Sequence, residues 1–383
     1  MLQHTYCQAN LPRLAQLILD NLPQECTLTT NNCYIIGLSG GVDSVVLLHL
    51  FKLLQNEYGF NLQAIHVNHN ISVNASTWQD FCEKLCHELH IPLTTFQHTI
   101  TRNGGESLEN NARKLRYQSF TEFYTKLPPT VMKQLKPIIV LAHHQDDQIE
   151  TILSQIFRGS DLHNISAMKP ISTKIITPDA HDNPNNNANV HINSTNIYQL
   201  FWRPLLNITK SEILDYATEH KLQHIEDESN SDTTYLRNFL RKDILPRLQS
   251  WDPHINNKIL KFNHYTKTAI ALIDEIAQTD LLATTKIKPH EATKIGALKA
   301  TTMVIDVIKF KQLSATRQHN LISHFILLCQ IALPSDNQIH EFCRQVNNSA
   351  WDRSPELKLS DTYSIKKHKN KIIITPYPKS LCN

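Results

Sequence analysis

The residues of this chain best suited to chemistry begin with S-G-G-V-D-S at positions 39–44. The chain has only 8 glycines in 383 residues, and three of them fall within positions 37–41. Backbone N–H groups of a glycine turn that leads into a helix can face an anion, and the helix dipole adds to the attraction. Ser39 and Ser44 add hydroxyl donors, whereas Asp43 would repel an anion unless a cation lies between them. The stretch therefore predicts a phosphate site with Mg²⁺ beside it.

Two better-known phosphate motifs are excluded. The chain contains neither a G-x-x-x-x-G-K-[ST] segment nor a G-x-G-x-x-G segment, so it has no Walker lysine and no dinucleotide fingerprint. The alternative interpretation is an ordinary glycine turn before a helix. That interpretation accounts for the glycines but not for Ser39, Asp43 and Ser44 together.

Two further polar clusters follow predicted strands: H-V-N-H at 66–69 and A-H-H-Q-D-D at 142–147. Strand and helix patterns alternate along the first half of the chain. The predicted strands are 34–38, 62–69, 93–100 and 137–143, and the predicted helices are 45–54, 76–89, 107–127 and 147–158. This order predicts an α/β fold with a doubly wound, mostly parallel sheet. Ligands of such sheets bind outside the carboxyl ends of the strands, so the three clusters should meet in one crevice.

Several charged residues have two interpretations each. Asp147 and Glu150 lie three apart on one helix face, where they could bind an amine or stabilise the helix start. The histidines 143–144 with the aspartates 146–147 could bind a metal, although no third cluster with ligand spacing supports structural zinc. Nucleotide contact or packing at the strand end is the other interpretation.

Arg237 and Arg241, four apart beside Asn238, also leave two possibilities open. They could contact a nucleic acid, or they could pair with Glu226 or Asp227 as a structural clamp.

Length and charge predict two domains. We expect a catalytic domain at 1–248 and a basic domain at 249–383, helical to about residue 348 and ending in short strands. Residues 1–250 hold 20 Lys and Arg against 24 Asp and Glu, whereas 251–383 hold 18 against 11, a net charge of −4 followed by +7. The basic part suggests a polyanion partner. The lysines 366, 367, 369 and 371 flank a predicted strand turn, where they could contact phosphates or simply face solvent.

An Asn-rich insertion at 179–196 is predicted to be mobile and without a function of its own.

Composition excludes other classes. No apolar run approaches the roughly 18 residues of a membrane span, and the N-terminus has no signal-peptide pattern. The eight cysteines include no C-x-x-C pair, which fits a reducing cytoplasm. We expect a cytoplasmic protein without a membrane partner.

The phosphate stretch resembles the loop of the N-type ATP pyrophosphatases, the PP-loop superfamily. Further stretches make the chain similar to the tRNA(Ile)-lysidine synthetase family within it. They are H-V-N-H, E-N-N-A-R-K-L-R-Y at 109–117, the run 142–159, F-W-R-P-L-L at 201–206 and the run 226–241. Segments at 313–342 and 363–375 resemble the family's substrate-binding region. The resemblance implies an adenine nucleotide alpha hydrolase-like fold followed by a smaller tRNA-binding domain.

The family's reaction implies two steps. ATP adenylates the C2 oxygen of the wobble cytidine in the CAU anticodon of tRNA(Ile) and releases pyrophosphate. Free lysine then attacks C2 through its ε-amine, AMP leaves, and lysidine switches decoding to AUA. An amine with a pKa near 10.4 must lose a proton to attack. Asp147 and Asp43 are both candidates for the base.

The resemblance also implies roles for individual residues. The ATP contacts would be Ser39, Gly40, Gly41, Val42, Asp43, Ser44, His66 and His143. Lysine would be bound by Asp147 and Glu150, and tRNA by Arg116, Arg203, Arg237, Asn238 and Arg241. Asp43, Asp147 and Arg113 would be catalytic; Arg113 and Arg116, with Mg²⁺, would offset phosphate charge. Mg²⁺ would come with ATP, with Asp43 as a possible ligand and no further metal motif.

Departures from the family pattern and rival functions remain. Asn70 stands where the family commonly has Gly, and Asn tolerates a left-handed backbone. Larger members carry a further C-terminal domain that we do not expect here.

A tRNA thiolase of the same superfamily would need cysteines for sulfur transfer, usually as C-x-x-C. A catalytically silent protein that binds tRNA and ATP is the rival from another class. No obligate protein partner is evident, and a homodimer is possible.

Overall fold

The computed structural model describes residues 11–70, 74–99, 108–127, 135–176, 197–226, 236–285, 303–329 and 331–376. The chain divides into two compact units, residues 1–261 and 262–383, and the division falls within helix α11 (Ile255–Thr284). The predicted insertion at 179–196 lies outside the described residues. In the part of the chain that is described, no helix combines the length and the apolar character needed to cross a membrane.

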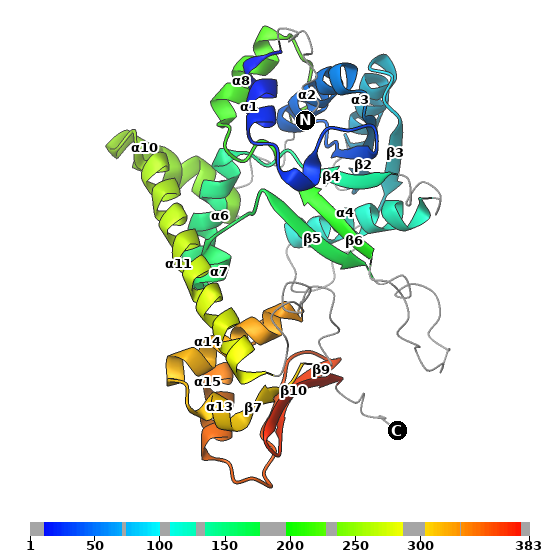
Figure 1. Cartoon of the computed structure of the whole chain (residues 1–383). Helices are drawn as coiled ribbons and strands as arrows, with labels where there is room; N and C mark the ends of the chain where they lie inside the picture. The colour runs from blue at the N-terminus through cyan, green and yellow to red at the C-terminus, as the bar shows by residue number, and fades with distance from the viewer. Residues whose placement is uncertain are drawn as a thin grey trace, which may run out of the picture. The chain divides into compact units, whose positions relative to one another are not determined.

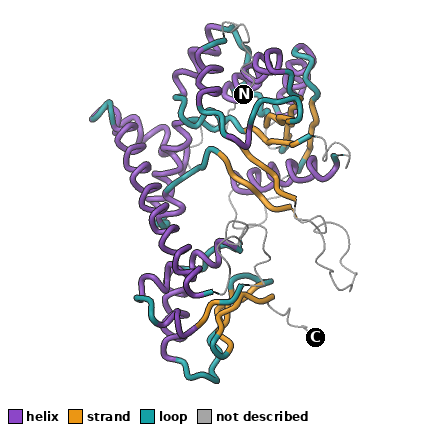
Figure 2. The backbone as a smooth tube through the Cα atoms, in the orientation of Figure 1, coloured by secondary structure: helices purple, strands orange, loops and turns teal. Residues whose placement is uncertain are grey.

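The first unit is built on a six-stranded sheet in the order β3-β2-β1-β4-β6-β5 (Figures 1 and 2). Its strands are β1 (Asn32–Gly37), β2 (Asn61–Asn68), β3 (Leu93–Gln97), β4 (Lys136–Val140), β5 (Ile171–Ile176) and β6 (Ile197–Trp202). Five strands run parallel, and only β5 pairs antiparallel, at the edge beside β6. The predicted α/β fold with a mostly parallel sheet is therefore confirmed. Neither β5 nor β6 was predicted.

Helices cover both faces of this sheet because the central strands are apolar on both sides. In β1, Tyr34 and Ile36 face the core formed with α2 (Val42–Tyr58), and Cys33 and Ile35 face the core that includes Phe120 of α4. The first face is covered by α1 (Arg13–Asp20), α2, α3 (Ala75–Glu88) and α8 (Lys210–Glu219), and the second by α4 (Leu108–Lys126) (Figure 1). Alternation with a period of two sends successive β1 side chains to opposite faces.

Two element boundaries differ from the prediction and matter for the site. Helix α2 begins at Val42 rather than at residue 45, so Asp43 lies in its first turn. Strand β4 ends at Val140 rather than at 143, and α6 (Gln145–Phe157) begins two residues earlier than predicted. The Asp147 carboxylate accepts a hydrogen bond from the His144 backbone N–H at 3.0 Å, which fixes this helix start.

Short helical segments complete the first unit. They are a 3₁₀ turn (Gln24–Cys26), α7 (Leu162–Ile165), α9 (Leu236–Phe239), a π-helical turn (Leu240–Ile244) and α10 (Leu245–Trp251). The continuous segment from α9 to α10 carries Arg237 and Arg241.

The second unit has its own apolar core, formed by helices and a small antiparallel sheet. It contains α13 (Val307–Lys311), α14 (Ala315–Leu328) and α15 (Asp336–Asn348). The sheet has the order β7-β10-β9-β8, with β7 at Ile305–Asp306, β8 at Glu356–Lys358, β9 at Tyr363–His368 and β10 at Lys371–Pro376. Fully buried Phe310, Phe325 and Ile372 lie in its core. A helical segment that ends in short strands is as predicted.

Candidate active site at the carboxyl edge of the parallel sheet

The loop between β1 and α2 is held together by its own hydroxyl groups. The Ser44 hydroxyl donates a hydrogen bond to the Gly41 carbonyl at 2.9 Å and accepts one from the Ser39 N–H at 3.1 Å. The Ser39 and Ser44 hydroxyl oxygens lie 3.1 Å apart. Ser44 and Val42 are buried, whereas Ser39 is exposed. The first amides of α2 have no carbonyl partner within the helix, so the loop presents donors to an anion at a helix N-terminus.

Gly40 is required in this loop for two reasons. Its φ of +88° lies in the left-handed region, and a Cβ atom there would be only 2.7 Å from the Ile225 Cδ1 atom. The Ile225 N–H also donates a hydrogen bond to the Gly40 carbonyl at 2.9 Å. The segment that contains Ile225 therefore packs directly on the phosphate loop, and only glycine permits this approach.

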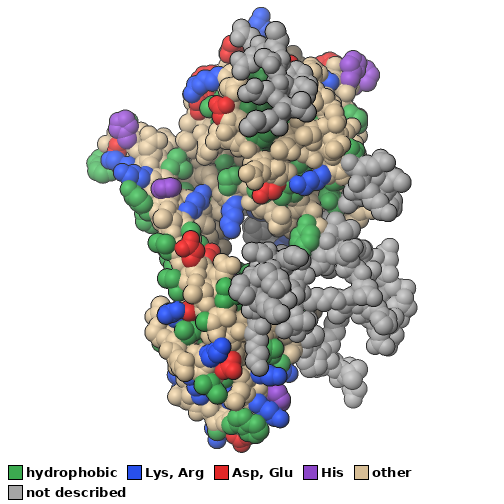
Figure 3. Space-filling view, viewed as in Figure 1, with side chains coloured by type: hydrophobic (Ala, Val, Ile, Leu, Met, Phe, Trp, Pro, Cys, Tyr) green, Lys and Arg blue, Asp and Glu red, His purple; other side chains and the backbone are tan. Residues whose placement is uncertain are grey.

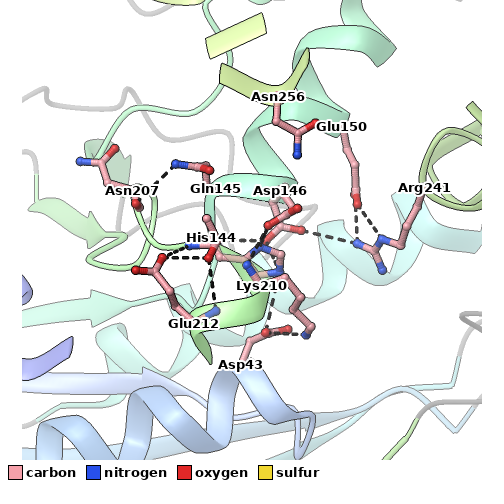
Figure 4. A network of polar contacts seen from close by, with 12 residues as sticks. Asp43, His144, Gln145, Asp146, Glu150, Asn207, Lys210, Glu212, Arg241 and Asn256 are labelled. Carbon is pink, nitrogen blue, oxygen red and sulfur yellow. Dashed lines mark hydrogen bonds and ion pairs between the residues drawn. The ribbon is translucent and has the colours of Figure 1, made fainter. Parts of the chain in front are cut away.

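Asp43 and Lys210 form an ion pair at the start of α2. The Lys210 Nζ atom lies 2.6 Å from Asp43 Oδ1, and the Lys210 backbone N–H donates to Asp146 Oδ2 at 2.8 Å (Figure 4). Lys210 is the first residue of α8, whose start is fixed by the reciprocal hydrogen bonds of Thr209 and Glu212. One lysine thus joins the phosphate loop, α6 and α8.

His144 lies among three carboxylates. Its Nε2 atom is 3.5 Å from Asp147 and 3.7 Å from Asp43, and its Nδ1 atom is 3.7 Å from Asp146. Burial disfavours the charged imidazolium, but the three carboxylates outweigh burial and raise the pKa of His144 above its ordinary value. The nearby His144 imidazole in turn lowers the pKa of Asp146. We expect the charge of this cluster to depend on pH.

Asp147 and Glu150 are paired with two arginines. Glu150 is 1% exposed and accepts hydrogen bonds at 2.6 Å from Nε of both Arg237 and Arg241. Arg237 also donates to Asp147. Burial alone would raise the pKa of Asp147, but Arg237 and the neighbouring imidazoles hold it below its ordinary value. One cluster of alternating charges therefore contains the two residues predicted to bind lysine, Asp147 and Glu150, and two of those predicted to bind tRNA, Arg237 and Arg241.

The cluster also bears on the two alternative interpretations. Asp147 does cap the start of α6, whereas Glu150 is directed to the arginines (Figure 4). Arg237 and Arg241 do clamp two elements together, through Asp147 and Glu150 on α6. Asp227, one of the partners that the sequence suggested, lies outside the described residues. Asn238 is half-buried between them in the chain.

The predicted nucleotide-contacting histidines lie at the ends of β2 and β4. His66 is buried, its Nδ1 atom lies 2.9 Å from the Leu38 carbonyl, and burial lowers its pKa. Burial also lowers the pKa of His143, to about 3. The buried Nδ1 atom of His143 has no hydrogen-bond partner among the described residues. Both imidazoles are therefore neutral at pH 7. Because Nδ1 of His66 donates to the Leu38 carbonyl oxygen, its Nε2 atom is left as a hydrogen-bond acceptor.

The arginines predicted on α4 and β6 differ in accessibility. Arg113 is exposed and lies over the Tyr117 ring at 5.5 Å. Arg116 is exposed, and its charge contributes to lowering the pKa of His143. Arg203 is 7% exposed, and its guanidinium donates to the Lys169 carbonyl and the Ser172 hydroxyl at 3.0 Å. This environment favours a structural role for Arg203, and its contact with tRNA stays a prediction.

Sequence reasoning assigned no site role to Lys210, and it named His144 and Asp146 only as members of a cluster that could bind a metal or contact the nucleotide. A partial signal existed for Lys210, because T-K-S-E at 209–212 is a capping-box pattern that predicts a helix start. Nothing in the sequence indicates that this helix start faces Asp43.

The donor set fits Mg-ATP at this edge of the sheet. The helix start offers amide donors, and Asp43 supplies a carboxylate whose side chain is 29% exposed. Carboxylate oxygen is the protein ligand that Mg²⁺ prefers, together with substrate phosphates. Lys210 provides a cation that can meet phosphate oxygens.

A parallel sheet whose first strand leads through this loop into a helix defines the PP-loop class of ATP-binding domains. Residues 11–248 match the family model described as the PP-loop domain, and residues 305–372 match the TilS substrate binding domain. The chain belongs to the tRNA(Ile)-lysidine synthase family, whose members are PP-loop ATP-using ligases.

Two curated relatives illustrate this membership. The tRNA(Ile)-lysidine synthase of Nitrosomonas europaea is 34% identical over 341 residues, which are 89% of this chain and 64% of that protein. The enzyme of Haemophilus ducreyi is 32% identical over 367 residues, which are 96% of this chain and 72% of that protein. Among solved structures, the U34-tRNA thiolase NcsA from Methanococcus maripaludis gives a TM-score of 0.49 at 17% identity, covering 66% of this chain and 76% of that one. This likeness is too distant to bear on the site.

Proposed function

We propose that this protein ligates free lysine to C2 of the wobble cytidine in the CAU anticodon of tRNA(Ile). The cytidine would first be activated by adenylation from ATP, with release of pyrophosphate, and lysine would then displace AMP. The observation that supports this most directly is the meeting of the phosphate loop, the Asp43–Lys210 pair and the buried Asp147–Glu150 pair at one edge of the sheet. We place the reaction in the cytoplasm, where tRNA, ATP and free lysine are available.

The phosphate end of the site is served by the loop and Lys210. Amides at the start of α2 and the Lys210 ammonium would offset charge on the transferring phosphate. Mg²⁺, held by Asp43 and the phosphates, would supply further charge neutralisation when bound. Lys210 pairs with Asp43 at 2.6 Å in this structure, so its ammonium is already directed toward the position where that charge would develop.

The lysine end of the site is served by the carboxylates on α6. A free amino acid carries ammonium and carboxylate groups, and the cluster offers both carboxylates and guanidinium groups to match them. The lowered pKa of Asp147 makes it a weak proton acceptor. Asp147 is therefore better suited to bind an ammonium group than to remove its proton.

The tRNA end is proposed to include the second unit. Residues 251–383 carry a net charge of +7, and on the face in Figure 3 basic side chains are interspersed with hydrophobic and acidic ones. Trp351 is 61% exposed, and the Lys369 ammonium lies 5.5 Å from the centre of its ring. An exposed aromatic ring beside a cation is a common arrangement for contact with unpaired bases.

Lys367 does not belong to this surface. It is 2% exposed, and its ammonium donates to the carbonyls of Ala350 and Arg353 at 2.7 and 2.9 Å. Burial lowers its pKa accordingly. Grouping it with Lys366, Lys369 and Lys371 as a possible phosphate contact was wrong, because its cation is used within the fold.

The thiolase alternative is less supported. The six described cysteines are unpaired. Burial raises the pKa of the Cys82 and Cys86 thiols to about 12, so these thiols are poor sources of the thiolate that sulfur transfer needs.

The direct test combines ATP, labelled lysine and unmodified tRNA(Ile), followed by nucleoside analysis. We expect labelled lysidine from the parent protein. Asp43→Asn should reduce the rate by about 10²–10³, the usual effect of losing one electrostatic contributor. The matched control is Asp215→Asn, because Asp215 is an exposed carboxylate on α8. This variant should leave the rate unchanged.

Two outcomes would contradict the proposal. One is the absence of lysine in the tRNA despite tRNA-dependent release of pyrophosphate, which would indicate a different nucleophile. The other is near-normal turnover by a correctly folded Asp43→Asn variant, which would remove Asp43 from the site.

A further inference from the structure

Three side chains of the second unit that are of metal-ligating type lie together, and none of them belongs to the site described above. They are His319 on α14 and Asp336 and His340 on α15. Their nearest donor atoms all lie within 4.8 Å of one another. Asp336 and His340 are one helical turn apart, so they lie on the same face of α15, and His319 reaches that face from the neighbouring helix.

The donor spacing fits a tetrahedral metal site. His319 Nε2 lies 3.0 Å from Asp336 Oδ1, and His340 Nε2 lies 3.3 Å from Asp336 Oδ2. Donors bound to Zn²⁺ at about 2.0–2.1 Å in a tetrahedron are about 3.3–3.4 Å apart. The two nitrogen–oxygen spacings, one to each oxygen of the Asp336 carboxylate, are close to this edge length.

Hydrogen bonding does not account fully for the cluster. The buried Nε2 atom of His319 makes no hydrogen bond within the described part of the chain, although a carboxylate oxygen is 3.0 Å away. The two imidazole rings are stacked, with centroids 4.2 Å apart and planes inclined by 28°. Two imidazoles directed at one carboxylate can both be satisfied by a cation between their nitrogen atoms.

We propose that His319, Asp336 and His340 bind a divalent transition metal, with Zn²⁺ as the natural match to two imidazoles and one carboxylate. Imidazole ligands favour Zn²⁺ and its neighbours over Mg²⁺. Three protein ligands leave the fourth tetrahedral position to water. The metal would join α14 to α15, and it would stabilise the second unit because the unfolded chain does not preform the site.

The test uses the full chain, free of any metal-binding tag, and Zn²⁺ as the probe. The protein is equilibrated with Zn²⁺, passed through a desalting column and assayed for bound metal and for thermal stability. The main variant is His340→Gln, whose side chain is 56% exposed, so that the fold should tolerate it. The matched control is His324→Gln, because His324 lies on α14 and pairs with Asp274 at 3.5 Å but is outside the cluster.

We expect the parent and His324→Gln to retain one more Zn²⁺ per chain than His340→Gln, and to show an increase in Tm with Zn²⁺ that His340→Gln lacks. Co²⁺ in place of Zn²⁺ should give the visible absorption of a four-coordinate site in the parent only. Equal Zn²⁺ content in the parent and His340→Gln, or an equal loss in His324→Gln, would overturn the proposal. Because neither readout depends on lysidine formation, failure here is independent of the proposed enzymatic function.

Discussion

Glu150 is buried, and its two hydrogen-bonded arginines are partly open to solvent, with side chains 32% and 40% exposed. Glu150→Gln removes the charge and leaves both arginines short of a partner. Breaking a buried pair costs about 3–5 kcal/mol; because solvent screens these arginines, we expect a smaller loss, about 1–3 kcal/mol. If Glu150 also binds lysine, KM for lysine should rise while KM for ATP changes little.

Denaturant unfolding and steady-state kinetics separate the two roles of Glu150. The control is Glu122→Gln, which removes a surface pair with Lys126 whose side chain is 69% exposed and should cost under about 1 kcal/mol. A loss of stability with an unchanged KM for lysine would assign Glu150 to the clamp alone.

His144 should make stability depend on pH. Its folded-state pKa is raised by Asp146, Asp147 and Asp43 against the opposing effect of burial. The stabilisation that it provides is therefore fully present below its unfolded pKa of about 6.5 and is lost as pH rises through the folded pKa. We expect the Tm difference between the parent and His144→Gln to shrink between pH 6 and pH 9. A difference that stays constant over this range would mean that His144 is not protonated in the folded protein.

At the scale of elements, the phosphate loop depends on the contact between Gly40 and Ile225. Gly40→Ala combines a left-handed backbone, which costs about 1–2 kcal/mol, with an overlap at 2.7 Å. Gly159→Ala is the matched control, because Gly159 has a φ of +64° but no atom within 4 Å of an added Cβ.

Chemical denaturation should show a larger loss for Gly40→Ala than for Gly159→Ala, and ATP binding should weaken only in Gly40→Ala. Equal losses would show that the Ile225 segment moves aside at little cost.

The sequence was sufficient to predict the elements that carry the site and insufficient to predict their partners. Asp43, Asp147 and Glu150 follow from local patterns, because apolar runs and a glycine turn define β1, α2 and α6. The 2.6 Å pair between Asp43 and Lys210 joins residues 167 positions apart. Similarly, the sequence offers the nearby Glu226 and Asp227 as partners of Arg237 and Arg241, but it does not reveal the pairs that both arginines form with α6. Long-range ion pairs have no periodicity in the chain from which they can be predicted.

At the scale of the whole molecule, the net charge of +7 in residues 251–383 predicts binding to tRNA that weakens with salt. Each phosphate contact contributes a slope of roughly −0.7 to −0.9 in log affinity against log salt. Reversing exposed Lys369 and Lys371 to Glu should make this slope less steep and leave ATP binding unchanged. Lys84 and Lys126, whose side chains are 76% and 69% exposed in the first unit, are the control pair for reversal.

Measuring tRNA affinity across salt concentrations for both double variants decides whether Lys369 and Lys371 contact tRNA. Parallel lines for the parent and the Lys369/Lys371 variant would mean that this hairpin does not contact RNA. A reduced slope in the Lys84/Lys126 variant would instead locate RNA contacts on the first unit.

The antiparallel edge strand also has a consequence for how this fold can evolve. All six residues of β5 pair with β6 from Ile171↔Trp202 to Ile176↔Ile197, so the pairing itself holds the end of β6 beside the active site. This pairing sets the register of β6 on β5 independently of the length of the chain between them. Doubling the length of a flexible connection costs only about 0.6 kcal/mol. Insertions and deletions between β5 and β6 should therefore be nearly neutral, which makes this hairpin a place where related enzymes can diverge in length without loss of catalysis.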